Sequence, residues 1–243
     1  MEKPEMIIFD YGHTLLYECN HNAENGNKAA YAYIKDNPDN VSYELFNKTC
    51  LELYAKMKAN RGNMEIHEHH FLKMLYDYLN IKSSISMIET EQIIWNGISK
   101  GAVMPYTVEM LDYLNEKGIR TAVISNLNWS GEALTNRLNR LLPNNKFEFV
   151  LASSEYVFPK PYSIMYEIAL KKANLTADKV WFCGDSISAD IKGAQSVGMF
   201  PVWYEGQTDE ANPFACFNDN QTIDFEHLHI CHWKELIDIL EKM

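Results

Sequence analysis

Six polar side chains follow short apolar runs of the sequence, either directly or a few residues later along the chain. They are Asp10, Ser125, Asn126, Lys160, Asp185 and Asp190. If the runs are strands of one parallel sheet, these side chains meet at the edge where the carboxyl ends of the strands lie, which is where such sheets bind ligands. Carboxylates brought that close repel one another unless a cation lies between them, and oxygen ligands in a small site suit Mg²⁺. A lysine and a serine among the acids suit a bound phosphoryl group, whose oxygens need donors.

The apolar runs predict strands. They cover residues 6–9, 121–124, 147–151, 180–183 and 200–203. Stretches with helical character separate them, at residues 107–117, 131–141, 163–173 and 187–196. Strands that alternate with helices in this way form βαβ units, so the predicted fold is α/β, with a Rossmann-like doubly wound parallel sheet. A last short strand near His229 and a helix over residues 233–240 are expected at the end of the chain.

The stretch after the first strand differs from the rest of the chain. From about residue 17 to residue 101 it is polar and aromatic, with helical periodicity and no clear strand. Four helices are predicted there, around residues 29–34, 45–57, 71–79 and 93–98. We therefore expect an α/β core made of residues 1–16 and 102–243, interrupted by a helical domain of residues 17–101, whose aromatic side chains form most of its interior.

Four segments in this order resemble the motifs of the haloacid dehalogenase superfamily, most members of which are Mg²⁺-dependent phosphatases. The segments are IIFDYGHTLL, AVISN, PKPYSIMYEIAL and FCGDSISADIKGAQSVGM. They cover roughly residues 5–16 and 104–205. The resemblance implies a catalytic core with an inserted helical cap of the C1 type. It also implies hydrolysis of a small phosphorylated metabolite through an aspartyl-phosphate intermediate.

The resemblance also implies a role for each matching residue. Asp10 would be the nucleophile, and Lys160 would neutralise both the nucleophile and the transferred phosphoryl group. The phosphoryl group would be bound by Thr14, Ser125, Asn126 and Lys160. Mg²⁺ would be held by Asp10, the backbone carbonyl of Gly12, Asp185 and Asp190, of which Asp190 would either support the metal or orient Lys160.

Gly12 departs from the family pattern. The phosphatases usually carry a second aspartate two residues after the nucleophile, which protonates the leaving group and then activates water. A glycine keeps the carbonyl ligand but transfers no proton, and general acid–base catalysis contributes about 10²–10⁴-fold.

Several interpretations of Gly12 stay open. In the first, the leaving group needs no acid, as in an acyl phosphate or a phosphoanhydride. In the second, His13 or a cap residue supplies the proton. In the third, the chain is a catalytically weak protein that binds phosphorylated ligands in a regulatory role. Members with other chemistry, dehalogenases among them, also lack this aspartate. Dehalogenases need no metal, however, so the presence of Asp185 and Asp190 favours a metal and a phosphoryl substrate.

Three other features offer chemistry without a complete site. His67, His69 and His70 stand close together but have no further metal ligands in register. Near the end of the chain, a second cluster consists of His227, His229, Cys231 and His232. The first three would share one strand face, so a zinc site is possible there. Arg61 is the one arginine of the helical stretch and is a candidate for contact with a substrate anion.

Composition excludes several other classes. The 243 residues carry 22 Lys and Arg against 33 Asp and Glu, a net charge of −11, which argues against nucleic acid and against anionic membrane surfaces as partners. No apolar run approaches the roughly 18 residues that span a bilayer, and the N-terminus does not resemble a signal peptide. The cysteine count is odd, with no CxxC pair, which is typical of a reduced, cytoplasmic protein. The substrate and the oligomeric state stay open at this level.

Overall fold

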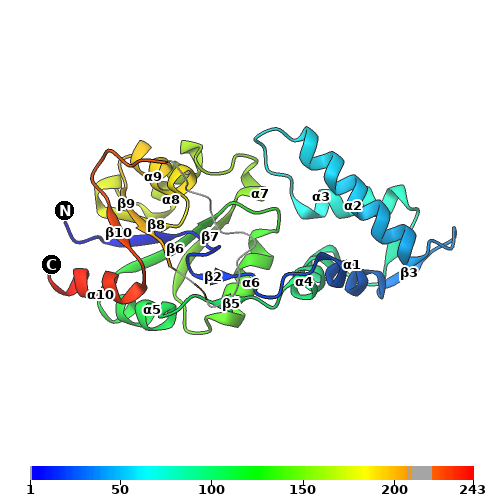
Figure 1. Cartoon of the computed structure of the whole chain (residues 1–243), viewed down its shortest axis with the longest axis horizontal. Helices are drawn as coiled ribbons and strands as arrows, with labels where there is room; N and C mark the ends of the chain where they lie inside the picture. Colours follow the sequence, from blue (N-terminus) through cyan, green and yellow to red (C-terminus); the bar gives the residue numbers. More distant parts are fainter. Residues whose placement is uncertain (1, 207, 209–220) are drawn as a thin grey trace.

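A six-stranded parallel sheet forms the centre of the larger part of the molecule (Figure 1). The computed structural model describes residues 2–206, 208 and 221–243. The strand order is β10-β9-β8-β1-β6-β7. These strands are β1 (Met6–Phe9), β6 (Arg120–Ser125), β7 (Phe147–Ala152), β8 (Val180–Gly184), β9 (Phe200–Tyr204) and β10 (Leu228–Ile230). The predicted α/β, doubly wound parallel sheet is confirmed, and each predicted strand is present with its ends shifted by at most two residues.

The order of the strands locates the ligand-binding edge. The chain runs outward from β1 to β6 and β7, then crosses back to place β8 on the other side of β1. Such a reversal of direction opens a crevice at the carboxyl ends of the central strands. β1 pairs with β6 on one side and with β8 on the other, so the residues that follow these three strands are brought together.

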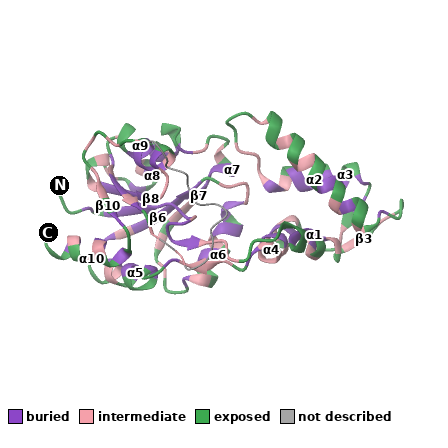
Figure 2. Ribbon diagram, in the orientation of Figure 1, coloured by how far each residue is buried: buried purple, intermediate pink, exposed green. Residues whose placement is uncertain are grey.

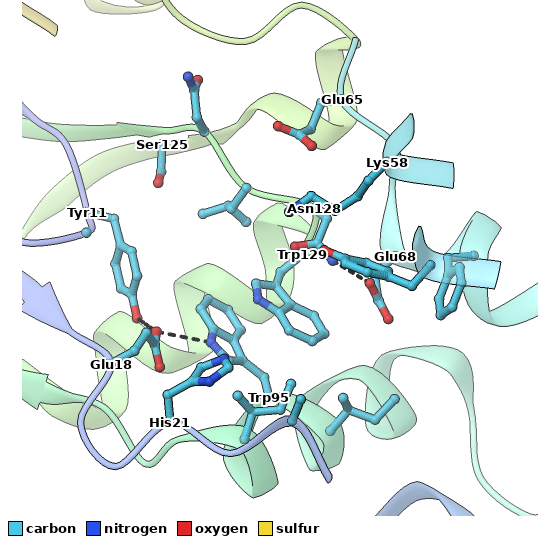
Figure 3. Close-up of a pocket in the computed structure, with 18 of the residues that line it drawn as sticks. Tyr11, Glu18, His21, Lys58, Glu65, Glu68, Trp95, Ser125, Asn128 and Trp129 are labelled. Carbon is cyan, nitrogen blue, oxygen red and sulfur yellow. Dashed lines mark hydrogen bonds between the residues drawn. The ribbon is translucent and has the colours of Figure 1, made fainter. Parts of the chain in front are cut away.

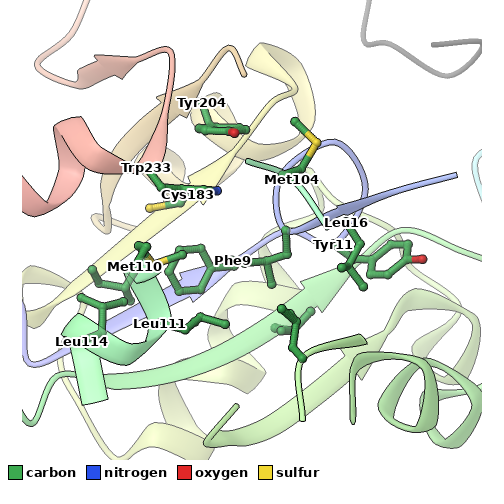
Figure 4. Packing of buried hydrophobic residues seen from close by; sticks show 14 of the residues in the cluster. Phe9, Tyr11, Leu16, Met104, Met110, Leu111, Leu114, Cys183, Tyr204 and Trp233 are labelled. Atoms are coloured by element: carbon green, nitrogen blue, oxygen red, sulfur yellow. The ribbon is translucent and has the colours of Figure 1, made fainter. Parts of the chain in front are cut away.

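Helices cover both faces of the sheet. Successive side chains of β1 point to opposite faces and are apolar, so each face needs an apolar layer packed against it. Ile7 and Phe9 pack in one cluster with residues of α5, α6 and α10, and Phe9 meets Trp233 edge to face (Figure 4). Met6 and Ile8 pack in the other cluster with residues of α8 and α9. The helices around the sheet are α5 (Thr107–Glu116), α6 (Gly131–Leu141), α7 (Ser153–Tyr156), α8 (Ser163–Ala173), α9 (Lys192–Ser196) and α10 (Trp233–Glu241), with a short 3₁₀ turn, η1 (Ala177–Lys179).

The predicted helix over residues 187–196 is divided into two parts. Its first part is a π-helical turn, η2 (Ile187–Ile191), and α9 follows. The N–H of Ile191 reaches back five residues to the carbonyl of Ser186 at 3.2 Å, which widens the turn. Wide turns of this kind often occur at functional sites, and this one contains Asp190, whose side chain is buried.

The stretch between β2 (Leu16–Tyr17) and β5 (Ala102–Val103) forms a separate helical layer, called here the helical segment (residues 18–101). It lies at one end of the molecule, opposite the two chain ends (Figure 1). Its helices are α1 (Ala23–Tyr31), α2 (Tyr43–Asn60), α3 (Glu68–Tyr78) and α4 (Met87–Ile98). β2 and β5 pair antiparallel where the chain leaves and re-enters the core. None of the described helices is long and apolar enough to cross a membrane.

Two expectations about this segment were wrong. Residues 33 and 34 do not belong to the first helix, which ends at Tyr31; Ile34 instead begins β3 (Ile34–Asp36), which pairs with β4 (Lys82–Ser83). The stretch therefore contains strands, too short to show a period of two. Most of its aromatic side chains are buried or half-buried, as expected, but Tyr33 and Tyr78 are exposed. Figure 2 shows that the buried residues of the molecule gather mainly along the central sheet.

Candidate active site

Lys160 lies between two carboxylates at the carboxyl edge of the sheet. Its Nζ donates a hydrogen bond to Oδ1 of Asp10 and another to Oδ1 of Asp190, each at 2.6 Å. All three side chains are buried. Burial lowers the pKa of Lys160, but the two carboxylates outweigh this effect and leave the pKa raised. The lysine therefore carries a fixed positive charge among acids.

The π-helical turn and a glycine position Asp190. Its Oδ2 accepts a hydrogen bond from the backbone N–H of Ser186 at 3.0 Å. A Cβ atom at Gly184 would lie 2.3 Å from that same carboxylate, so this end of β8 accommodates Asp190 only with glycine. Burial raises the pKa of Asp190, and Lys160 opposes that rise. Both oxygens of Asp190 are thus held by neighbours, which fits an orienting role toward Lys160.

Three carboxylates converge beside this lysine. Asp10, Asp185 and Asp190 each offer an oxygen, and these oxygens lie within 4.8 Å of one another. The pairing of β1 with β8 produces this arrangement, since Phe9 is opposite Cys183 and an aspartate follows soon after each of them. Hard oxygen donors gathered this closely are the set that Mg²⁺ prefers.

Ser125 ends β6, the strand on the other side of β1, and Asn126 follows it. Ser125 is buried at the end of β6. The side chain of Asn126 holds the backbone of Lys160 from two sides: its Nδ2 donates to the Lys160 carbonyl at 2.8 Å, and its Oδ1 accepts from the Lys160 N–H at 2.7 Å. No local sequence pattern indicates this pair of hydrogen bonds. Asn126 positions Lys160, and its predicted contact with phosphate stays a prediction.

The loop after β1 carries the other predicted residues. A Cβ atom added to Gly12 would have no atom within 4 Å, so space for a side chain exists there. His13 is buried with a positive φ of 53°, and burial lowers the pKa of its ring while Glu18 opposes that change. Thr14 is fully buried, and its Oγ1 has no hydrogen-bond partner. It is the one predicted site residue that does not line the pocket described next.

A pocket of about 750 Å³ lies between this edge of the sheet and the helical segment (Figure 3). It brings together eight of the predicted residues: Asp10, Gly12, His13, Ser125, Asn126, Lys160, Asp185 and Asp190. Arg61 lines it too, paired with Glu65. The sequence analysis missed the rest of the lining, above all Glu18, Glu68, Asn128 and Trp129. Their positions depend on how the helical segment meets the core, which no local pattern reveals.

Hydrogen bonds join the helical segment to the core around this pocket. Asn128 donates from Nδ2 to Glu68, whose own N–H donates to the Asn128 carbonyl at 2.7 Å. Burial raises the pKa of Glu68 to about 8, while the bond from Asn128 lowers it. Arg137 of α6 pairs with Glu18 at 2.6 Å. The segment is therefore fastened over the pocket through charged and polar side chains.

The histidine clusters have other partners. His67 caps the start of α3, and His69 pairs with Glu91 at 2.7 Å. At the edge of the sheet, ligand atoms of three exposed residues lie within 4.8 Å of one another: Glu205, His229 and Cys231. Zinc binding there stays a prediction, with Glu205 as a member that the sequence analysis missed. The four described cysteines are free, and Cys216 lies outside the described residues.

Comparisons with known proteins agree with this geometry. The family model of the haloacid dehalogenase-like hydrolases matches residues 36–203. The chain is 24% identical to glyceraldehyde 3-phosphate phosphatase of Methanocaldococcus jannaschii, over 98% of this chain and 97% of that protein. It is also 24% identical to ribulose-1,5-bisphosphate 5-phosphatase of Halopiger xanaduensis, over 82% and 84%. The crystal structure of a HAD phosphatase from Thermococcus onnurineus superimposes with a TM-score of 0.59, at 17% identity and 98% coverage of both chains.

The chain belongs to the haloacid dehalogenase-like hydrolase family, because the family model covers more than half of its length. It is therefore an enzyme of the hydrolase class, with the α/β Rossmann-like fold that the sequence predicted.

Proposed function

We propose that this protein is a Mg²⁺-dependent phosphatase that hydrolyses a small phosphorylated metabolite through an aspartyl-phosphate on Asp10. One observation carries the proposal: Lys160 bridges Asp10 and Asp190 at 2.6 Å, with Asp185 close by, on the floor of a pocket. Asp10 lies at the end of a central strand and faces a pocket, and Lys160 offsets the negative charge that would otherwise repel a phosphate. This arrangement fits a nucleophile better than a residue that only supports the fold. The relatives named for phosphorylated sugars support the same substrate class.

The proposed chemistry has two displacements. Asp10 attacks the phosphorus through Oδ2, since Oδ1 is held by Lys160. A bond forms between this oxygen and phosphorus while the bond to the leaving-group oxygen breaks. Water then attacks the phosphorus of the aspartyl-phosphate, which releases inorganic phosphate and restores the carboxylate. Lys160 offsets the negative charge of the phosphoryl group throughout, and the Ser125 hydroxyl donates to one of its oxygens.

The donor set fits Mg²⁺, because three carboxylates offer oxygens within 4.8 Å of one another. We propose that Asp10, Asp185 and the Gly12 carbonyl hold the ion, with Asp190 in support. A bound Mg²⁺ would reduce the charge of the phosphoryl oxygens. The cation and Lys160 together would make the site attractive to an anionic substrate, although the chain as a whole carries a net charge of −11.

Residue 12 has no carboxylate, so in the hydrolysis of an alkyl phosphate another group must exchange protons with the leaving group and with water. We propose His13, which lines the same pocket one residue further along. The helical segment, as a cap, would exclude water and contact the leaving group. Acyl phosphates need no proton donor, so their turnover should depend less on His13 than turnover of alkyl phosphates does.

The test is a panel of sugar phosphates and acyl phosphates, assayed for phosphate release with Mg²⁺ and with EDTA. We expect turnover of at least one ester with Mg²⁺ and its loss with EDTA. A second candidate is a binding protein with weak turnover, which Gly12 favours. Binding of phosphate esters without release above background would establish that candidate and overturn the phosphatase.

A further inference from the structure

Two tryptophans form a stack on the wall of the pocket. Trp129, in the loop between β6 and α6, lies flat against Trp95 of α4, with ring centroids 5.1 Å apart and planes 11° apart. The guanidinium of Arg137 lies over the Trp95 ring at 4.4 Å, and Nε1 of Trp95 donates to Glu18 at 3.1 Å. Trp95 is buried, so its position is fixed by contacts on several sides. The stack is therefore already formed in the absence of a ligand.

Trp129 is the more exposed member of this stack. It is half-buried and lines the pocket, and Figure 3 shows it between Trp95 and Glu68. Among the described residues, Trp95 is the one ring that stacks on it. An indole held by a stacked neighbour offers a flat surface at little entropic cost, and such surfaces bind aromatic rings. This wall of the pocket is thus better suited to an aromatic ring of the substrate than to the hydroxyl groups of an open-chain sugar.

The stack is within reach of the phosphoryl site. Trp129 follows Ser125, the last residue of β6, by four residues. Four residues span at most about 14 Å even when fully extended. One molecule with a phosphate at one end and a ring at the other can therefore contact both, and a cavity of about 750 Å³ has room for it.

Polar groups beside the stack narrow the choice of ring. Asn128 precedes Trp129 and is hydrogen-bonded to Glu68, and both line the pocket. An amide and a carboxyl group can donate to and accept from the edge of a ring that carries N–H and C=O groups. A plain phenyl ring has no polar atom at its edge and would form no hydrogen bond with these groups.

We propose that Trp129 is a substrate-binding residue that stacks on the leaving group, and that the preferred substrates are phosphate monoesters of alcohols carrying a heteroaromatic ring on a pentose or short chain. This inference rests on the proposed phosphatase function for its kinetic part. The binding of the ring itself is independent of catalysis.

The kinetic test compares matched esters. Uridine and adenosine 5′-monophosphates carry a ring, whereas ribose 5-phosphate has the same kind of primary ester without one. We expect the ratio of kcat/KM values to favour a ring-bearing ester by about tenfold or more, and to fall by about tenfold in Trp129→Leu. Trp129→Phe should retain most of the preference.

Trp203→Leu is the matched control, because Trp203 stacks on His229 at the sheet edge and is not among the residues that line the pocket. Equal kcat/KM values for all three esters in the wild-type protein would overturn the inference.

A binding test separates this inference from the phosphatase proposal. Uridine and adenosine, which lack phosphate, are titrated into the ¹⁵N-labelled protein while the indole N–H signals are followed by NMR. We expect the Trp129 signal to shift, and binding to weaken by about tenfold in Trp129→Leu. Nucleoside binding without turnover of any ester would overturn the phosphatase and keep the stacking site. Turnover of ribose 5-phosphate without nucleoside binding would overturn the stacking site and keep the phosphatase.

Discussion

Glu68 provides a prediction whose size follows from the structure. The side chain is 5% exposed, and burial raises its pKa from 4.5 to about 8. Replacing it with glutamine keeps the shape and the acceptor for Asn128 but removes the titrating proton. At about 1.4 kcal/mol per pKa unit, this rise in pKa corresponds to a loss of at most about 5 kcal/mol in the free energy of unfolding once Glu68 is ionised.

The direction of the pH effect follows from proton binding. Because the folded pKa lies above the unfolded one, the folded chain keeps a proton at Glu68 that the unfolded chain loses. The free energy of unfolding should therefore fall as pH rises from about 4.5 to about 8, with the full penalty present above that range.

Urea unfolding followed by circular dichroism at pH 5.5, 7 and 9 measures this effect. We expect Glu68→Gln to gain stability relative to the wild type as pH rises, by about 2 kcal/mol or more at pH 9. Glu52→Gln is the control, because Glu52 is an exposed glutamate of the same segment. Parallel pH profiles for Glu68→Gln and the wild type would refute the assignment of a raised pKa to Glu68.

Two further changes test the catalytic edge. Gly12→Asp should fold normally, because its Cβ meets no atom within 4 Å, and should raise kcat for alkyl phosphates by about 10²-fold if proton transfer limits the rate; a fall in kcat would show a site built around glycine. Lys160→Met leaves the carboxylates of Asp10 and Asp190 without their shared cation, so phosphate release should be lost and stability should fall by about 3–5 kcal/mol in thermal unfolding at neutral pH. Retained turnover in Lys160→Met would contradict the role given to the lysine.

The sheet and its catalytic edge could be predicted because each depends on short-range signals. The run Met6–Phe9 is apolar at every position, as a strand buried on both faces must be, and Asp10 follows it directly. The same holds for β8 and Asp185. Parallel strands with polar residues at their ends leave few alternatives for where those residues meet.

The parts that could not be predicted depend on contacts between distant segments. The clamp of Asn126 on Lys160 joins residues 34 positions apart, and a lone asparagine after a strand gives no sign of it. The π-helical turn η2 contains Asp190, which is hydrogen-bonded to Lys160 from 30 positions away. Helical periodicity depends on local spacing alone, and it indicated one regular helix there. Trp129 acquires its surroundings from Trp95 across the boundary between core and helical segment.

The central claim is that Asp10 carries the phosphoryl group during turnover. The most direct measurement mixes the protein with a turned-over ester, quenches with borohydride, which reduces an aspartyl-phosphate to homoserine, and maps residue 10 by mass spectrometry. We predict homoserine at position 10 in the wild type and unmodified asparagine with no turnover in Asp10→Asn. Homoserine at another aspartate, or phosphate release by Asp10→Asn at the wild-type rate, would contradict the mechanism.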